Sequence, residues 1–96
     1  MSEAETIQTV LNALLTHRCA EFRLSDEEYL IQPDNNKGCD YLSLWRTSPR
    51  PERLGEAMYD VMYGIDEDAV SELLHRSCIH GQSVLSYAQS ERVEWL

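Results

Sequence analysis

The sequence has few basic residues, few cysteines and no long hydrophobic run, and each shortage excludes a class of protein. Among its 96 residues, 8 are lysine or arginine and 17 are aspartate or glutamate, which gives a formal net charge of -9. This charge disfavours direct binding to nucleic acid or to an anionic membrane surface. No stretch approaches the roughly twenty consecutive apolar residues that a membrane-spanning helix needs. The composition therefore predicts neither a nucleic-acid-binding protein nor a membrane protein.

The cysteines and the N-terminus indicate the compartment. Three cysteines are an odd number, and they contain no CxxC pair, so they fit free thiols in a reducing cytoplasm better than a disulfide framework. The first residues carry two glutamates and no basic residue before their spaced apolar positions, unlike a secretory signal. Hydrophobic residues at 43% and charged residues at 26% are typical of soluble globular proteins. We expect one acidic, cytoplasmic domain over residues 1–96.

Hydrophobic spacing predicts an N-terminal helix followed by three strands. Apolar residues between positions 7 and 15 recur at helical spacing, and Ser2 with Glu5 matches the capping-box pattern. From Ala20 onward the apolar residues alternate with polar ones, which is typical of a strand. The predicted strands cover residues 20–24, 29–32 and 41–45. Pro33 is expected to stop the second strand because proline cannot donate a backbone hydrogen bond. These strands predict an antiparallel meander.

Helical spacing returns after the proline-framed joint at residues 47–51. Apolar residues from Leu54 to Met62 predict a helix that ends near Gly64. Asp66 is expected to cap a further helix whose apolar face reaches Cys78. Ser83 is expected to cap a short last helix. Residues 93–96 are interpreted as an edge strand or an apolar plug. The prediction is an α+β fold: an N-terminal helix, a three-stranded antiparallel meander, then two or three C-terminal helices packed on one sheet face. The other face would be a natural docking surface.

The candidates for chemistry are few. His75, Cys78 and His80 combine imidazole with thiol, as zinc and copper sites do, and a Cys-His pair is also the core of a nucleophilic site. The favoured interpretation is a buried thiol with two surface histidines, because a fourth ligand and an oxyanion site lack a local source. Residues 34–40 are similar to a calcium loop, but Cys39 stands where that loop needs glycine and Trp45 where it needs glutamate, so a hairpin turn is expected instead. We therefore predict no catalytic residue, no metal site, no cofactor and no enzyme activity.

Arg46, Arg50 and Arg53 form the one locally basic segment. If the helix predicted after residue 51 exists, its N-terminal amides and these guanidinium groups would suit a bound anion. Ion pairs with the numerous carboxylates are the favoured alternative.

The acidic residues carry the main functional hypothesis. We expect a non-enzymatic domain that binds another protein through its sheet face or through the helix predicted over residues 54–62. The expected partner-binding residues are Asp26, Glu27, Glu28, Tyr59, Tyr63, Asp66, Glu67 and Asp68. The alternative is an inhibitor that imitates nucleic acid and occupies a DNA- or RNA-binding protein, such as an anti-CRISPR protein. A homodimer is a further alternative.

Two short stretches carry a resemblance to a group of proteins. Residues 28–33 (EYLIQP) and 41–46 (YLSLWR), after an amphipathic first helix, resemble small uncharacterised acidic proteins of Gram-positive gut bacteria and their mobile elements. The closing residues 81–95 extend the resemblance, whereas the predicted helices over residues 54–78 depart from it. The resemblance implies a bacterial cytoplasmic protein with an accessory or counter-defence role, and it implies no catalytic residue.

Overall fold

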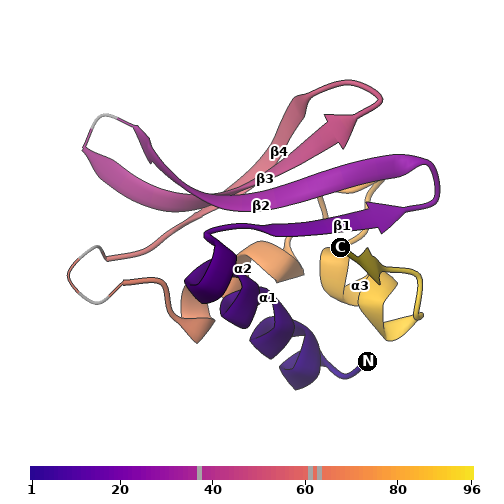
Figure 1. Ribbon diagram of the computed structural model, residues 1–96, viewed down its shortest axis with the longest axis horizontal. Coiled ribbons are helices and arrows are strands. Elements are labelled where there is room, and N and C mark those ends of the chain that lie inside the picture. Colours follow the sequence, from indigo (N-terminus) through magenta and orange to yellow (C-terminus); the bar gives the residue numbers. More distant parts are fainter. Residues whose placement is uncertain (37, 61, 63) are drawn as a thin grey trace.

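The computed structural model, which describes residues 1–36, 38–60, 62 and 64–96, is an α+β fold with helices on one face of an antiparallel sheet (Figure 1). The elements follow one another as α1 (Glu3–His17), β1 (Ala20–Leu24), β2 (Glu27–Asn36), β3 (Cys39–Ser48), β4 (Glu52–Met58), α2 (Glu67–His75), α3 (Val84–Gln89) and β5 (Glu94–Trp95). The predicted α+β class and the N-terminal helix are confirmed.

Within the described residues the strands form one five-stranded sheet in the order β4-β3-β2-β1-β5. The first four strands follow one another as antiparallel hairpins, and β5 returns from the C-terminus to pair with β1. The predicted meander of three strands is therefore part of a larger sheet. β2 and β3 are also longer than predicted, with 10 residues each.

The starts of the helices lie where the capping residues predicted them. At α1 the Ser2 hydroxyl accepts the Glu5 N–H at 3.1 Å, and the Glu5 carboxylate accepts the Ser2 N–H at 3.3 Å. The hydroxyl and then the backbone N–H of Ser2, as hydrogen-bond partners of the Glu5 carboxylate, hold the pKa of Glu5 below its usual value. The side chains of Asp66 and Ser83 accept N–H bonds in the first turns of α2 and α3. Each cap pairs backbone N–H groups that a helix start otherwise leaves without a partner.

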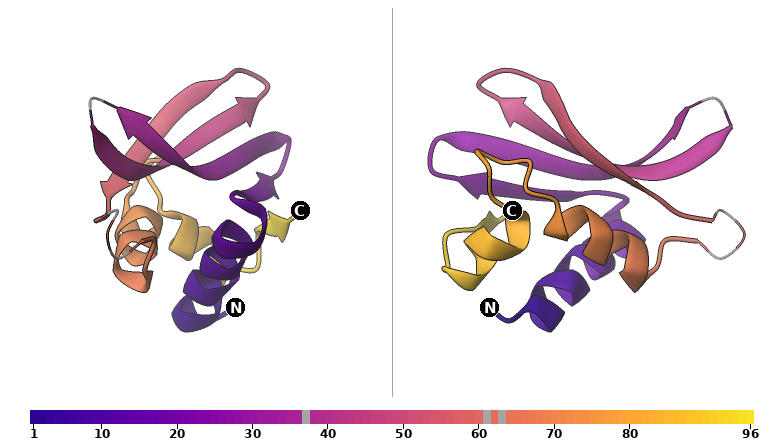
Figure 2. Two further views of the ribbon diagram at one scale, coloured as in Figure 1. Left: turned by 60° about the vertical axis from the view of Figure 1, so that its left-hand side comes forward. Right: turned by 180° about the vertical axis from the view of Figure 1, so that it is seen from behind.

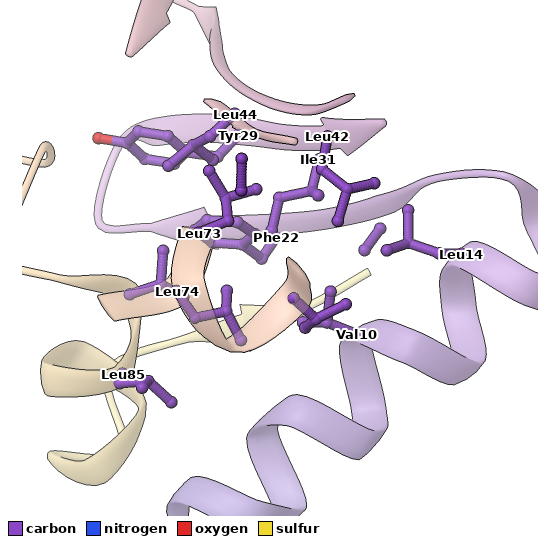
Figure 3. Packing of buried hydrophobic residues seen from close by; sticks show 14 of the residues in the cluster. Val10, Leu14, Phe22, Tyr29, Ile31, Leu42, Leu44, Leu73, Leu74 and Leu85 are labelled. Atoms are coloured by element: carbon purple, nitrogen blue, oxygen red, sulfur yellow. The ribbon is translucent and has the colours of Figure 1, made fainter. Parts of the chain in front are cut away.

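One hydrophobic core lies between the sheet and the three described helices (Figures 2 and 3). Its largest fully buried side chains come from every layer: Val10, Leu14, Phe22, Tyr29, Ile31, Leu42, Leu44, Val70, Leu73, Leu74, Ile79 and Val84. The Phe22 ring stacks on the Tyr29 ring with a centroid distance of 5.1 Å. The centroid of the Trp95 ring of β5 lies 5.4 Å from that of Phe22. The aromatic contact to Trp95 explains why so short a strand stays docked at the sheet edge.

The helix predicted over residues 54–62 is wrong, because the first part of that segment is strand β4. β4 pairs with β3, and a β-bulge between Leu44 and Trp45 shifts the register. Leu44 pairs with Gly55 and Trp45 with Arg53, so Leu54 is the extra residue. A bulge breaks the alternation of period two. It brings Leu54 and Ala57, three positions apart, to the core, which is the spacing that imitates a helix.

Two smaller expectations are also corrected. Pro33 lies inside β2 and pairs with Leu42 rather than ending the strand. The pairing of β1 with β2 extends only as far as Ile31. At Pro33, β2 therefore pairs with β3 alone, and a missing N–H is tolerated on its other side. The helix after Asp66 ends at His75, and Cys78 lies beyond it.

Candidate functional site

The face of the sheet opposite the helices is the candidate site, and we call it the open sheet face. Both views of Figure 2 place the helices on the other side, and no element of the described residues covers this face. The strand register assigns the open sheet face the residues Glu21, Arg23, Glu28, Leu30, Gln32, Asp34, Tyr41, Ser43, Trp45, Arg53, Glu56, Met58 and Glu94. Leu30, Tyr41, Trp45 and Met58 form its apolar centre, in which Tyr41 is buried while the other three keep exposed surface.

A hydrogen bond holds the Trp45 indole on the open sheet face. Its indole N–H donates to the Ser43 hydroxyl at 3.1 Å, and that hydroxyl donates to the Gln32 carbonyl at 3.4 Å. Ser43 has no exposed surface although it belongs to the open sheet face. The indole is half-buried and its position is fixed in the free protein, so binding a partner would order it at little entropic cost.

Arg53 orders the other half of the apolar centre. Its guanidinium lies over the Tyr41 ring, 4.7 Å from the ring centroid, and pairs with the carboxylate of Glu56. The β4 bulge makes this possible, because it brings Arg53 and Glu56, three positions apart, to the same face. Tyrosine, tryptophan and arginine are the residue types that most often dominate protein interfaces.

Carboxylates surround this centre and outnumber the arginines. Arg23 binds Glu28 at 2.8 Å and Glu94 at 3.7 Å, and the hydrogen bond that it donates to Glu28 raises the pKa of Arg23. Glu21 and Asp34 take part in no ion pair within the described part of the chain. The open sheet face is therefore apolar at its centre and negative at its rim.

The acidic residues predicted to bind a partner divide into two groups. Asp26, Glu27 and Glu28 lie at the β1–β2 turn, and Asp66, Glu67 and Asp68 lie at the start of α2. Figure 1 places that turn and the start of α2 at opposite ends of the molecule, and the reverse view in Figure 2 agrees. The two groups are not brought together.

Glu27 is occupied by contacts within the protein. Its carboxylate accepts bonds from the Tyr29 hydroxyl at 2.9 Å and from Nε2 of His80 at 2.6 Å, and Arg46 lies 3.7 Å away. The bond from His80 and then that from Tyr29 hold the pKa of Glu27 below its usual value. Asp26 is exposed in the turn.

Of the tyrosines predicted to bind a partner, the described one is partly buried, whereas the neighbouring methionines are exposed. Tyr59 is half-buried against the core, and burial followed by the nearby Asp40 raises its pKa. Tyr63 lies outside the described residues. Met58 and Met62, which are apolar positions of the helix predicted over residues 54–62, are 65% and 86% exposed. Met58 belongs to the open sheet face, whereas Met62 lies in the loop after β4.

His75, Cys78 and His80 do not converge. His75 binds Glu3 of α1 at 2.7 Å, and His80 binds Glu27. Cys78 packs beside Gly55, and burial raises the pKa of its thiol. No group of three or more metal-ligating side chains occurs among the described residues.

The arginines of the basic segment pair with carboxylates where the structure describes a partner. Arg46 binds Glu52 at 2.6 Å, besides its contact with Glu27, and Arg53 binds Glu56. The helix start that would have completed an anion site there does not exist, because the segment is β4.

The sequence reasoning assigned neither Leu30 nor Trp45 to a binding surface. A signal was available in residues 41–45, where apolar side chains occur at both phases of the alternation. Leu42 and Leu44 face the core, so Tyr41 and Trp45 must face outward.

Comparison with protein-family models, curated proteins and solved structures found no match. The resemblance drawn from the sequence therefore stays a prediction. Among the described residues, none of the helices combines the length and hydrophobicity required to cross a bilayer.

Proposed function

We propose that this protein is a non-enzymatic interaction domain whose open sheet face binds a basic, partly apolar surface of another protein. The observation that carries the proposal is the preordered apolar centre of an otherwise uncovered sheet face. Trp45 is held by Ser43 before any partner arrives, and Tyr41, only 6% exposed, supports this surface from beneath the Arg53 guanidinium. A surface that is ordered in advance loses less conformational entropy on binding.

The charge of the rim argues for a basic partner. Carboxylates outnumber arginines on the open sheet face, and the whole chain carries a net charge of -9. Two copies of such a surface would repel each other, which disfavours a homodimer through this face. A basic partner gains both electrostatic attraction and apolar contact.

The experiment is affinity capture from a bacterial lysate with a matched pair of variants. Met58→Lys adds a positive charge to the open sheet face, and Met62→Lys makes the same change at an exposed methionine outside it. The wild type and Met62→Lys should retain the same partner, and Met58→Lys should reduce its recovery about tenfold. Retention of that partner should also weaken as salt rises.

Two outcomes contradict the proposal. Equal recovery by all three proteins would place the binding surface elsewhere. Loss of the partner on changing Asp66, Glu67 and Asp68 together to their amides, with Met58→Lys unaffected, would favour the nucleic-acid-mimic alternative. Asparagine also caps helices well, so these amides leave α2 intact.

A further inference from the structure

A cleft of about 480 Å³ lies between the β1–β2 turn, the turn at residues 79–82 and the end of α3. Its lining residues are Leu24, Ser25, Glu27, His80, Tyr87 and Arg92. The volume falls within the roughly 300–1,000 Å³ of pockets that bind small molecules. Leu24 and Glu27 share the helix-covered side of the sheet, so the cleft is separate from the open sheet face.

The turn that carries His80 has an unusual sequence for its shape. Ile79 and Gln82 exchange both backbone hydrogen bonds, at 3.0 and 2.9 Å, around His80 and Gly81. Both central residues have positive φ, 49° for His80 and 78° for Gly81, as in a type I′ turn. The first central residue of such a turn is usually asparagine or glycine. A histidine at this position adopts the positive φ at a conformational cost.

The end of α3 positions Arg92 in a similar way. The N–H of Arg92 donates to the Tyr87 carbonyl at 3.0 Å, and that of Glu91 to the Ala88 carbonyl at 3.1 Å. This pair of bonds is the Schellman motif, in which glycine normally occupies the position of Glu91. Glu91 has a φ of 56°, and Ser25 in the cleft wall has a φ of 54°. Strained residues thus gather around one cleft, as they do at functional sites.

The charges in the cleft leave one cation without a partner. Glu27 already accepts hydrogen bonds from Tyr29 and His80, and the Arg46 guanidinium 3.7 Å away offsets its negative charge. Arg92 takes part in no ion pair within the described residues. Glu27 accepts a hydrogen bond from Nε2 of His80, so Nδ1 is the remaining ring nitrogen, and it donates to an anion when the imidazole is protonated.

We infer that this cleft binds a small organic anion, with its phosphate or carboxylate group held by Arg92 and by the Nδ1–H of the protonated His80 imidazole, and its apolar part against Leu24 and Tyr87. Arg92 supplies the charge, and a guanidinium suits the paired oxygens of both groups. Glu27 acts as a positioning residue, because its bond to Nε2 fixes the orientation of the imidazole.

The test is an NMR titration of the labelled protein with phenyl phosphate, benzoate and the neutral control benzyl alcohol. The wild type should bind at least one of the two anions in the millimolar range expected of a small fragment, and the tighter of them identifies the preferred oxyanion. Amide signals of Ser25, His80 and Arg92 should shift and saturate together. Arg92→Gln and His80→Asn should each weaken binding about tenfold. His80→Asn keeps the turn, because asparagine accepts positive φ.

Arg50→Gln is the matched control, because Arg50 is an exposed arginine outside the cleft whose loss removes the same charge. It should bind like the wild type, and so should Met58→Lys, which separates this inference from the sheet-face proposal. The inference is overturned if neither anion gives saturable shifts at these residues, if benzyl alcohol binds equally, or if Arg50→Gln weakens binding as much as Arg92→Gln.

Discussion

Glu27 gathers contacts from parts of the chain that are far apart in sequence. Tyr29 lies two positions away, Arg46 belongs to the next strand, and His80 is 53 positions distant. The sequence predicted Glu27 as a surface carboxylate available to a partner. It could not predict the bond to His80, because that bond depends on the turn at residues 79–82 folding back over the β1–β2 hairpin. Local pattern carries no information about such long-range contacts.

We predict that Glu27→Gln destabilises the protein at neutral pH but not in acid. The pKa of Glu27 is held below its usual value by His80 and Tyr29, so the ionised carboxylate stabilises the fold. That contribution is present above the pKa of the unfolded chain and is lost as the pH falls through the lower pKa of the folded state. Urea unfolding of both proteins at neutral pH and at about pH 3 measures the difference.

Asp26→Asn is the control for that comparison. Asp26 is an exposed carboxylate one position away, with no ion pair among the described residues. Its substitution should change stability little at either pH. A destabilisation by Glu27→Gln that is the same in acid as at neutral pH would argue against an ionic origin.

At the scale of the elements, local signals were reliable for helix starts and unreliable for β4. The caps at Ser2, Asp66 and Ser83 act within a few residues, so the sequence alone predicts them. β4 depends on pairing with β3, and the bulge at Leu54 gives it the apolar spacing of a helix. Tertiary pairing decides between the two structures, and hydrophobic periodicity cannot report it.

Gly55 provides a test of the strand. A Cβ at this position would lie 3.3 Å from Sγ of Cys78, 3.6 Å from Cδ of Arg76 and 3.8 Å from a methyl carbon of Leu73. Gly55→Val should therefore destabilise the protein by about 1–3 kcal/mol, as overpacking does. In a helix over the same residues, valine would instead be slightly better than glycine. Thermal unfolding distinguishes the two.

The same substitution in a Cys78→Ala background refines the test. Removal of Sγ opens space for the new side chain, so the loss caused by Gly55→Val should be smaller there. Equal losses in both backgrounds, or a gain in stability, would contradict the packing of β4 against the segment that carries Cys78.

At the scale of the whole molecule, the one-sided placement of the helices determines what is available for binding. The helices lie on one side of the sheet (Figure 1), and the core lies between them and the sheet. The other side carries Trp45 and Tyr41, which contact Ser43 and Arg53. The sequence predicted a sheet with one covered face, because its strands alternate. It placed the partner contacts on acidic residues and on a helix, since nothing local distinguishes a carboxylate that faces a partner from one that is already paired.

The central claim is that a partner docks on the open sheet face. Its most direct test is to add the captured partner to the labelled protein and to follow the NMR signals of the indole N–H of Trp45 and the methyl groups of Leu30 and Met58. We expect these signals to shift or broaden, while those of Asp66, Glu67 and Asp68 stay in place. Changes confined to the start of α2, with the three open-face side chains unaffected, would contradict the account.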